Sequence, residues 1–165
     1  ELPMSLVSNG IGRIQVSDQG GNFLARAILT TDSHPKETAV GIKIGQKTVT
    51  IGGIAKGAGM IHPNMATLLS FIATDANISK QLLDDMLKES ANSSFNMISI
   101  DGDTSTNDSV IVFANGASGA DNIESGSDEA HLFLEALRWV CTHLAKEIVK
   151  FVNTVCFIST ACFYI

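Results

Sequence analysis

The residues that could do chemistry gather in two polar stretches of this sequence. The first is Lys56-Gly-Ala-Gly-Met-Ile-His-Pro-Asn-Met-Ala-Thr67, which sets a lysine, a histidine and a threonine hydroxyl in a glycine-rich context. The second is Asp101-Gly-Asp-Thr-Ser-Thr-Asn-Asp108, in which oxygen-bearing side chains recur at alternate positions. The chemistry open to such residues is phosphate binding, cation binding or nucleophilic attack by a hydroxyl.

Phosphate and calcium fit these stretches poorly. A P-loop needs Gly-x-x-x-x-Gly-Lys-Ser/Thr at the start of a helix, whereas Lys56 precedes Gly57 and no helix is expected to begin there. An EF-hand loop needs glycine where Thr106 stands and glutamate where Val112 stands. Residues 101–108 are therefore interpreted as a polar turn bonded to its own backbone, or as a loop that shapes a polar pocket beside a nucleophile.

The histidines and serines do not point to a metal or to a serine hydrolase. The four histidines stand at positions 34, 62, 131 and 143, and no pair has the i, i+4 spacing of a helical zinc site. No Gly-x-Ser-x-Gly elbow is present. His62 is closest to Thr67 in sequence, and a structural role in the loop competes with that of a base. Thr67 remains a candidate nucleophile, although a threonine that opens a strand is usually structural.

The apolar pattern predicts a mixed α/β fold around these stretches. Helices are predicted over 79–91, with Ser79 as N-cap, and over 128–150. Gly45-Gln46 suits a type II′ turn between two strands, and the glycines between 52 and 59 predict a flexible connection. Because the elements lack a tight βαβ rhythm, part of the strand pairing should be antiparallel. The predicted strands are 23–30, 39–44, 47–51, 68–73, 95–100 and 109–114.

Composition limits the partners and the compartment. The 165 residues are 45% hydrophobic, enough for one core, and a net charge of −6 argues against nucleic acid, which needs clustered Lys and Arg. The three cysteines make no even disulfide framework and no Cys-x-x-Cys site, so they are interpreted as buried small side chains in a reducing compartment. The apolar end, residues 151–165, is too short to span a bilayer, and no secretion signal is recognised. We expect a cytoplasmic protein with no membrane partner, or an organelle lumen if the source is eukaryotic.

The order of these motifs resembles the ornithine acetyltransferase family of arginine biosynthesis. The stretch from Lys56 to Thr67 carries the likeness most strongly, and the resemblance covers residues 1 to about 150. It implies an N-terminal-nucleophile-like fold with mixed, partly antiparallel sheets and helices, incomplete in this chain and truncated at both ends. The other matching motifs are Leu2-Pro-Met4, Thr30-Thr-Asp32-x-x-Pro-Lys36, Thr74-Asp-Ala76, Ser94-Phe-Asn96, Asp101 to Asp108 and Ala114-Asn-Gly116.

The resemblance implies self-cleavage between Ala66 and Thr67. Residues 1–66 would then end an α-subunit-like part, and residues 67–150 would begin a β-subunit-like part. The freed α-amine of Thr67, with a pKa of about 8, can activate its own hydroxyl.

By the same resemblance, Thr67 takes the acetyl group of N-acetylornithine and passes it to glutamate, the reaction of a glutamate N-acetyltransferase. Thr30 and Lys56 match the family's substrate-binding threonine and lysine, and a lysine suits an amino-acid carboxylate. No cofactor is implied, although bifunctional members accept acetyl-CoA as a donor. The family's two-subunit units associate as an α/β heterotetramer.

Two departures from the family predict a poorly active fragment. The family's oxyanion-hole pair, Thr-Gly, lies before Leu2 in the motif order and is absent here; loss of one such donor typically costs about a hundredfold in rate. Asn153 stands where the family has a substrate-binding glutamate, at the start of a divergent apolar tail, residues 151–165.

Two alternatives stay open. One is an N-terminal-nucleophile amidohydrolase or aminopeptidase that passes the acyl group to water. The other is a non-catalytic fragment that only binds an amino acid or assembles with a partner chain.

Overall fold

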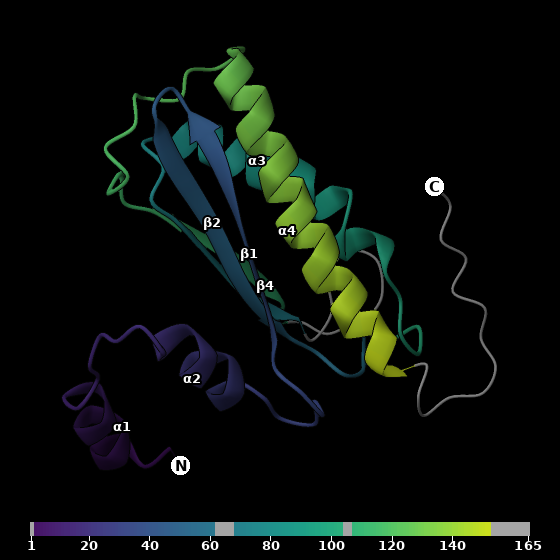
Figure 1. The fold of residues 1–165 in the computed structure, drawn as a ribbon. Coiled ribbons are helices and arrows are strands. Elements are labelled where there is room, and N and C mark those ends of the chain that lie inside the picture. Colours follow the sequence, from purple (N-terminus) through teal and green to yellow (C-terminus); the bar gives the residue numbers. More distant parts are fainter. Residues whose placement is uncertain (1, 62–67, 104–106, 153–165) are drawn as a thin grey trace.

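One four-stranded sheet forms the centre of the protein. The computed structural model describes residues 2–61, 68–103 and 107–152. The strands lie in the order β1-β2-β3-β4 (Figure 1). β1 pairs antiparallel with β2, β2 pairs antiparallel with β3, and β3 pairs parallel with β4, which confirms the mixed α/β class with partly antiparallel pairing. The strand bounds are Lys36–Ile44 for β1, Lys47–Lys56 for β2, Leu69–Thr74 for β3 and Ser109–Ala114 for β4.

Two long helices cover one face of this sheet (Figure 1). They are α3, Lys80–Asn92, and α4, Asp128–Val152, with the short 3₁₀ helix η1, Phe95–Met97, after α3. The helices α1, Met4–Ile11, and α2, Gly20–Ala27, lie apart from α3 and α4, and α1 buries none of its residues. The core therefore sits between the sheet and α4, where apolar side chains from both are fully buried: Val49, Ile51, Ile72, Phe133, Leu137, Val140, Leu144 and Ile148.

The hairpin and the two long helices agree with the sequence predictions. Gly45 has a φ of 56° and Gln46 has no positive φ, as a type II′ turn requires. The hydroxyl of Ser79 accepts a hydrogen bond from the amide of Leu82 and caps α3, as predicted. No helix in the described part of the chain is long and apolar enough to cross a membrane.

The predicted strand over 23–30 is wrong, because α2 occupies most of it. This run is rich in Leu, Ala and Arg, which favour helix, and a short apolar run does not reveal its secondary structure by periodicity alone. The predicted strand over 95–100 is also wrong. The hydroxyl of Ser94 bonds to the carbonyl of Ser90, so the chain keeps turning after α3, and only Ile100 forms an isolated bridge, to Ile61.

The glycine-rich connection expected over 52–59 is partly a strand, because β2 continues to Lys56. Gly52 and Gly53 lie inside β2, where α4 crosses the sheet. A Cβ at position 53 would lie 3.0 Å from Leu144 Cδ1 and 3.1 Å from Val140 Cγ1. Gly53 therefore permits close approach of α4 to the sheet, and its role is packing rather than flexibility.

We predict that Gly53→Ala lowers stability whereas Gly52→Ala does not. The added methyl at 53 overpacks the contact with α4, and we expect a loss of about 1 kcal/mol. A Cβ at position 52 meets nothing closer than 3.7 Å, so Gly52→Ala should be neutral or slightly stabilising through the unfolded chain. Urea unfolding of the two variants checks this, and equal midpoints would contradict the packing role of Gly53.

Candidate functional site

The segment that carries the predicted nucleophile is held at both of its ends. Thr67, with Ala66 and His62, lies outside the described residues, as does Asn153. The described residues that flank the segment are Ile61 and Leu68. Residues 99 and 100 contact Ile61, and residues 108 and 109 contact Leu68. Both flanks of the predicted cleavage segment are thus fixed by residues that are close together in the sequence.

The upstream end is fixed by backbone pairing and by Asp101. The amide of Ile61 donates to the carbonyl of Ile100 at 3.1 Å, and the hydroxyl of Ser99 donates to the carbonyl of Ile61 at 3.2 Å. The amide of Met60 donates to the Asp101 carboxylate at 2.7 Å. Met60 and Asp101 have φ values of 54° and 64°, which non-glycine residues seldom adopt. Strained backbone of this kind collects at functional sites.

The downstream end is fixed by Asp108. Its carboxylate accepts a hydrogen bond from the amide of Leu68, the residue directly after Thr67, and the amide of Ser109 donates to the carbonyl of Leu68 at 2.9 Å. Burial raises the pKa of Asp108, while the Leu68 amide and the charge of Lys56 act in the opposite direction. Lys56 thus lies within electrostatic reach of Asp108, at the start of β3. Within residues 101–108, the amide of Asp103 donates to the Asp101 carboxylate at 3.3 Å, as in a polar turn bonded to its own backbone, and the interpretation as a loop beside the nucleophile stays a prediction.

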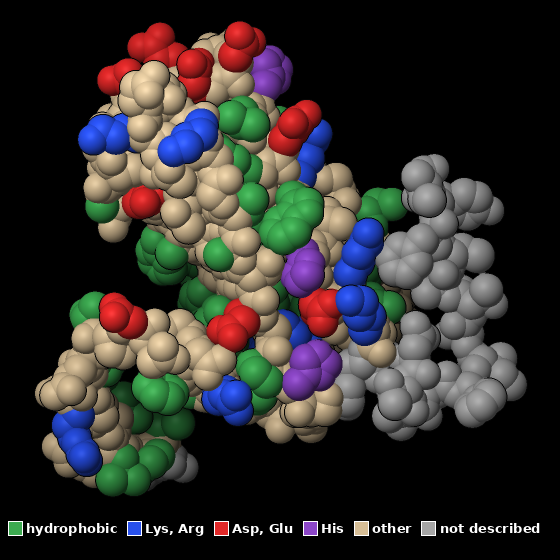
Figure 2. All heavy atoms as spheres, viewed as in Figure 1, with side chains coloured by type: hydrophobic (Ala, Val, Ile, Leu, Met, Phe, Trp, Pro, Cys, Tyr) green, Lys and Arg blue, Asp and Glu red, His purple; other side chains and the backbone are tan. Residues whose placement is uncertain are grey.

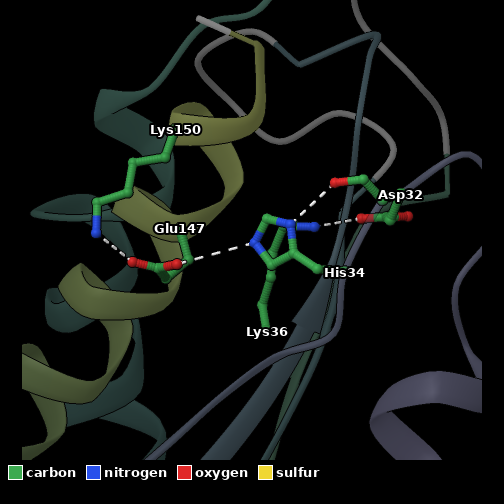
Figure 3. Close-up of polar contacts among 6 residues, drawn as sticks. Asp32, His34, Lys36, Glu147 and Lys150 are labelled. Carbon is green, nitrogen blue, oxygen red and sulfur yellow. Dashed lines mark hydrogen bonds and ion pairs between the residues drawn. The ribbon is translucent and has the colours of Figure 1, made fainter. Parts of the chain in front are cut away.

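Lys56 and Thr30, the predicted substrate-binding residues, stand beside a buried ion pair. Lys56 is half-buried and ends β2, where it pairs with Leu69 of β3. Thr30 is exposed in the bend after α2. Two residues further on, the Asp32 carboxylate lies 2.5 Å from the Lys36 ammonium, and both side chains are fully buried (Figure 3). The same oxygen of Asp32, Oδ1, accepts a hydrogen bond of 2.8 Å from the amide of Gly57, the residue after Lys56.

The environment of Asp32 keeps it ionised. Burial alone would raise the pKa of Asp32, but the hydrogen bonds from Lys36 and Gly57 and the Lys36 charge together hold that pKa below its usual value. The backbone N–H of Thr30 adds a smaller effect in the same direction. Asp32 is therefore a buried anion that faces a buried cation.

A second, more exposed set of contacts joins residues 30–36 to the end of α4. His34 Nε2 lies 3.9 Å from Glu147 Oε2, and Glu147 also pairs with Lys150 (Figure 3). The hydrogen bond from Lys150 lowers the pKa of Glu147, and the nearby histidines act in the same direction. The chain between Thr30 and Lys36 is thus held against both β2 and α4.

Asp32, Lys36 and Asp108 were not candidates from the sequence. All three lie inside the matching motifs, but Asp32 and Asp108 bind backbone amides 25 and 40 residues away along the chain, and Lys36 is the counter-ion of Asp32. A lysine that opens a strand is normally taken for a solvated edge residue. Among the described residues, no group of three or more His, Cys, Asp or Glu side chains could hold a metal ion.

Comparison with known proteins identifies the family. The sequence model of the ArgJ family matches residues 1–153. The chain belongs to the ArgJ family. This confirms the resemblance to the ornithine acetyltransferase family. The matched range includes every residue that the structure describes.

The relatives within the ArgJ family are longer than this chain. The arginine biosynthesis bifunctional protein ArgJ of Symbiobacterium thermophilum is 52% identical over 151 residues, which are 90% of this chain and 38% of the relative. The protein of the same name from Staphylococcus epidermidis is 46% identical over 149 residues, 90% of this chain and 37% of the relative. The chain thus spans less than two fifths of these relatives. A crystal structure of the Bacillus halodurans protein, at 40% identity and a TM-score of 0.47, overlaps 48% of this chain and 38% of its own.

We predict that Asp108→Asn keeps the fold and that Asp108→Ala weakens it. Asparagine retains an acceptor for the Leu68 amide, whereas alanine leaves that amide unpaired, at a cost of about 1 to 3 kcal/mol. The pKa of Asp108 is raised on folding, so its contribution to stability is present below the unfolded value of about 3.9 and is lost as the pH rises through the folded value. Asparagine does not ionise, so the stability of Asp108→Asn should not fall in this way as the pH rises.

Unfolding midpoints of the three proteins between pH 3 and 8, measured in the same denaturant, check the prediction. If Asp108→Ala were as stable as Asp108→Asn, the hydrogen bond to Leu68 would carry no weight in the fold.

Proposed function

We propose that this chain is a piece of an acetyltransferase of arginine biosynthesis that moves an acetyl group from N-acetylornithine to glutamate through Thr67. The observation that carries the proposal is membership in the ArgJ family over residues 1–153, which includes the motif from Lys56 to Thr67. The contacts of residues 99–109 with both flanks of residues 62–67 support it, because self-cleavage requires a scissile segment held in place.

The first step of the proposal is cleavage of the chain. The Thr67 hydroxyl oxygen attacks the carbonyl carbon of Ala66, the bond to the Thr67 nitrogen breaks, and the peptide becomes an ester. Water then hydrolyses the ester, leaving a carboxylate on Ala66 and a free amine on Thr67. Asp108 contributes by holding the amide of Leu68, the described residue directly after the proposed nucleophile.

The second step is acetyl transfer. The freed amine accepts the proton of the Thr67 hydroxyl, the hydroxyl oxygen takes the acetyl group of N-acetylornithine, and ornithine leaves; glutamate then takes the acetyl group from Thr67. Lys56 supplies a cation for the carboxylate of the amino acid, and Thr30 a hydroxyl at the same site. The transfer needs no cofactor, and acetyl-CoA would serve only as a second donor, as in bifunctional proteins.

The proposal includes assembly with further polypeptide, as an α/β heterotetramer. The sheet face opposite α3 and α4 carries an apolar groove of about 740 Å³ between α2 and the strands. Phe71, Ile54 and Phe113 line it, and Phe113 is 57% exposed. Figure 2 shows the hollow between the α1–α2 segment and the rest of the molecule, with apolar side chains beside it. A second polypeptide over this face would bury it, which fits a chain that spans 38% of its relative.

A reducing, cytoplasmic location completes the proposal. Cys141 is buried and free in the core, and burial raises the pKa of its thiol to about 12, so it is inert toward oxidation. It behaves as the small apolar side chain that the sequence suggested.

Self-cleavage is the first test. We expect denaturing mass spectrometry of the purified chain to give two pieces divided between Ala66 and Thr67, and the Thr67→Ala variant to give one intact mass. An intact mass for both proteins would show that Thr67 does not cleave this chain. Cleavage without acetyl transfer to glutamate, but with release of acetate from N-acetylornithine, would instead favour an amidohydrolase.

The role of Lys56 is tested by substrate binding. Lys56→Met removes the cation from the site, and we expect the affinity for N-acetylornithine to fall about tenfold or more, as for loss of a charge-assisted hydrogen bond. Lys47→Met is the matched control, since Lys47 is exposed at the opposite end of β2. Titration followed by NMR measures both, and equal affinities would rule out Lys56 as the carboxylate ligand.

A further inference from the structure

The buried carboxylate of Asp32 binds the chain directly after the end of β2. In the register of β1 and β2, Lys36 pairs with Ala55, so the next residues along, Pro35 and Lys56, would face each other. Proline has no amide hydrogen and cannot continue the ladder. Gly57 lies one residue beyond the end of β2, and its amide donates to Asp32 Oδ1 at 2.8 Å instead of to a carbonyl of β1.

A gain in stability alone does not explain why a carboxylate is buried at position 32. Both charged side chains are fully buried, and a buried ion pair seldom contributes more stability than apolar side chains of the same volume. What the carboxylate provides, and an apolar side chain does not, is a directional acceptor. That acceptor sets the direction in which the chain leaves β2, directly after Lys56.

Asp32 also fixes the position of the segment that carries Thr30. Thr30 is two residues away in sequence, and its N–H lies close enough to act on the carboxyl, although no hydrogen bond of ordinary geometry reaches Oδ2 from the described residues. One side chain therefore connects two segments 25 residues apart, and each carries one of the substrate-binding residues of the proposed site.

We propose that Asp32 is a positioning residue, whose hydrogen bond to the Gly57 amide places Lys56 relative to Thr30 for substrate binding. Lys36 serves this arrangement as the counter-ion that makes burial of the carboxylate tolerable. The inference rests on the proposed function, because it assigns Asp32 a part in that same site.

Two charge-neutral double variants separate positioning from simple charge burial. Asp32→Asn with Lys36→Met removes both charges but keeps an oxygen acceptor for Gly57. Asp32→Ala with Lys36→Met removes both charges and the acceptor. Circular dichroism and thermal unfolding establish that each variant is folded, and the amides inside β2 are the reference for local order.

Two readouts are taken on the full 165-residue chain. Hydrogen exchange of the Gly57 amide, followed by NMR, reports the hydrogen bond without reference to any substrate. Titration with N-acetylornithine reports the site. We expect the asparagine variant to keep Gly57 protection and an affinity within about threefold of the unaltered chain. The alanine variant should lose that protection and bind about tenfold more weakly or worse, with β2 still protected.

The possible failures can be told apart. An unaltered chain that does not bind N-acetylornithine overturns the substrate-binding roles proposed for Thr30 and Lys56 in this chain, and the positioning role of Asp32 with them. Binding that is equally strong in both double variants, or equally weakened in both, overturns the positioning role alone. A Gly57 amide that exchanges in the unaltered chain as fast as an exposed amide also overturns it, and this measurement does not depend on whether any variant folds.

Discussion

The protein depends most on the requirement that a buried carboxylate keep its buried counter-ion. The side chains of Asp32 and Lys36 are fully buried, so the free energy of the fold requires that the ammonium and the carboxylate stay together. Because they belong to the turn before β1 and to the start of β1, that turn cannot open without exposing or separating them. The turn, the first residue of β1 and the end of β2 are therefore positioned as one unit.

The parallel pairing of β3 and β4 determines what lies beside the predicted nucleophile. Parallel neighbours start at the same edge of a sheet, so the chain that enters β4 arrives next to the chain that enters β3. In the sequence, Thr67 is two residues before the start of β3, and residues 101–108 come directly before β4. Proximity of the acidic loop to the proposed cleavage segment follows from topology, with the crossover made through α3.

The sequence predicts those parts of the fold whose signals are local. The hairpin at Gly45, the cap at Ser79 and the apolar stripe of α4 are read correctly because a turn, a cap and a helical face involve neighbours within a few residues. The run 23–30 is misread since its apolar side chains suit either a strand or a helix, and tertiary contacts decide.

The site is predicted only in part, because some of its contacts join residues that are distant in the sequence. Family motifs nominate Thr30, Lys56 and Thr67, and the Asp32 carboxylate joins the segments that carry the first two through its hydrogen bond with Gly57. Asp32 and Asp108 act on Gly57 and Leu68, residues whose closeness exists only after the sheet has formed. No local pattern marks a carboxylate whose partner is a distant backbone amide. The division at residue 66 stays a prediction, although strands from both sides of it share one sheet.

That shared sheet has a mechanical consequence. β2 and β3 are hydrogen-bonded neighbours, and their ladder includes no residue between Ile61 and Leu68. Cleavage between Ala66 and Thr67 would remove a covalent tether yet leave the ladder, the helix packing and the buried charge pair untouched. The two products would remain a single particle under dilution, parting only where solvent conditions dissolve the sheet itself.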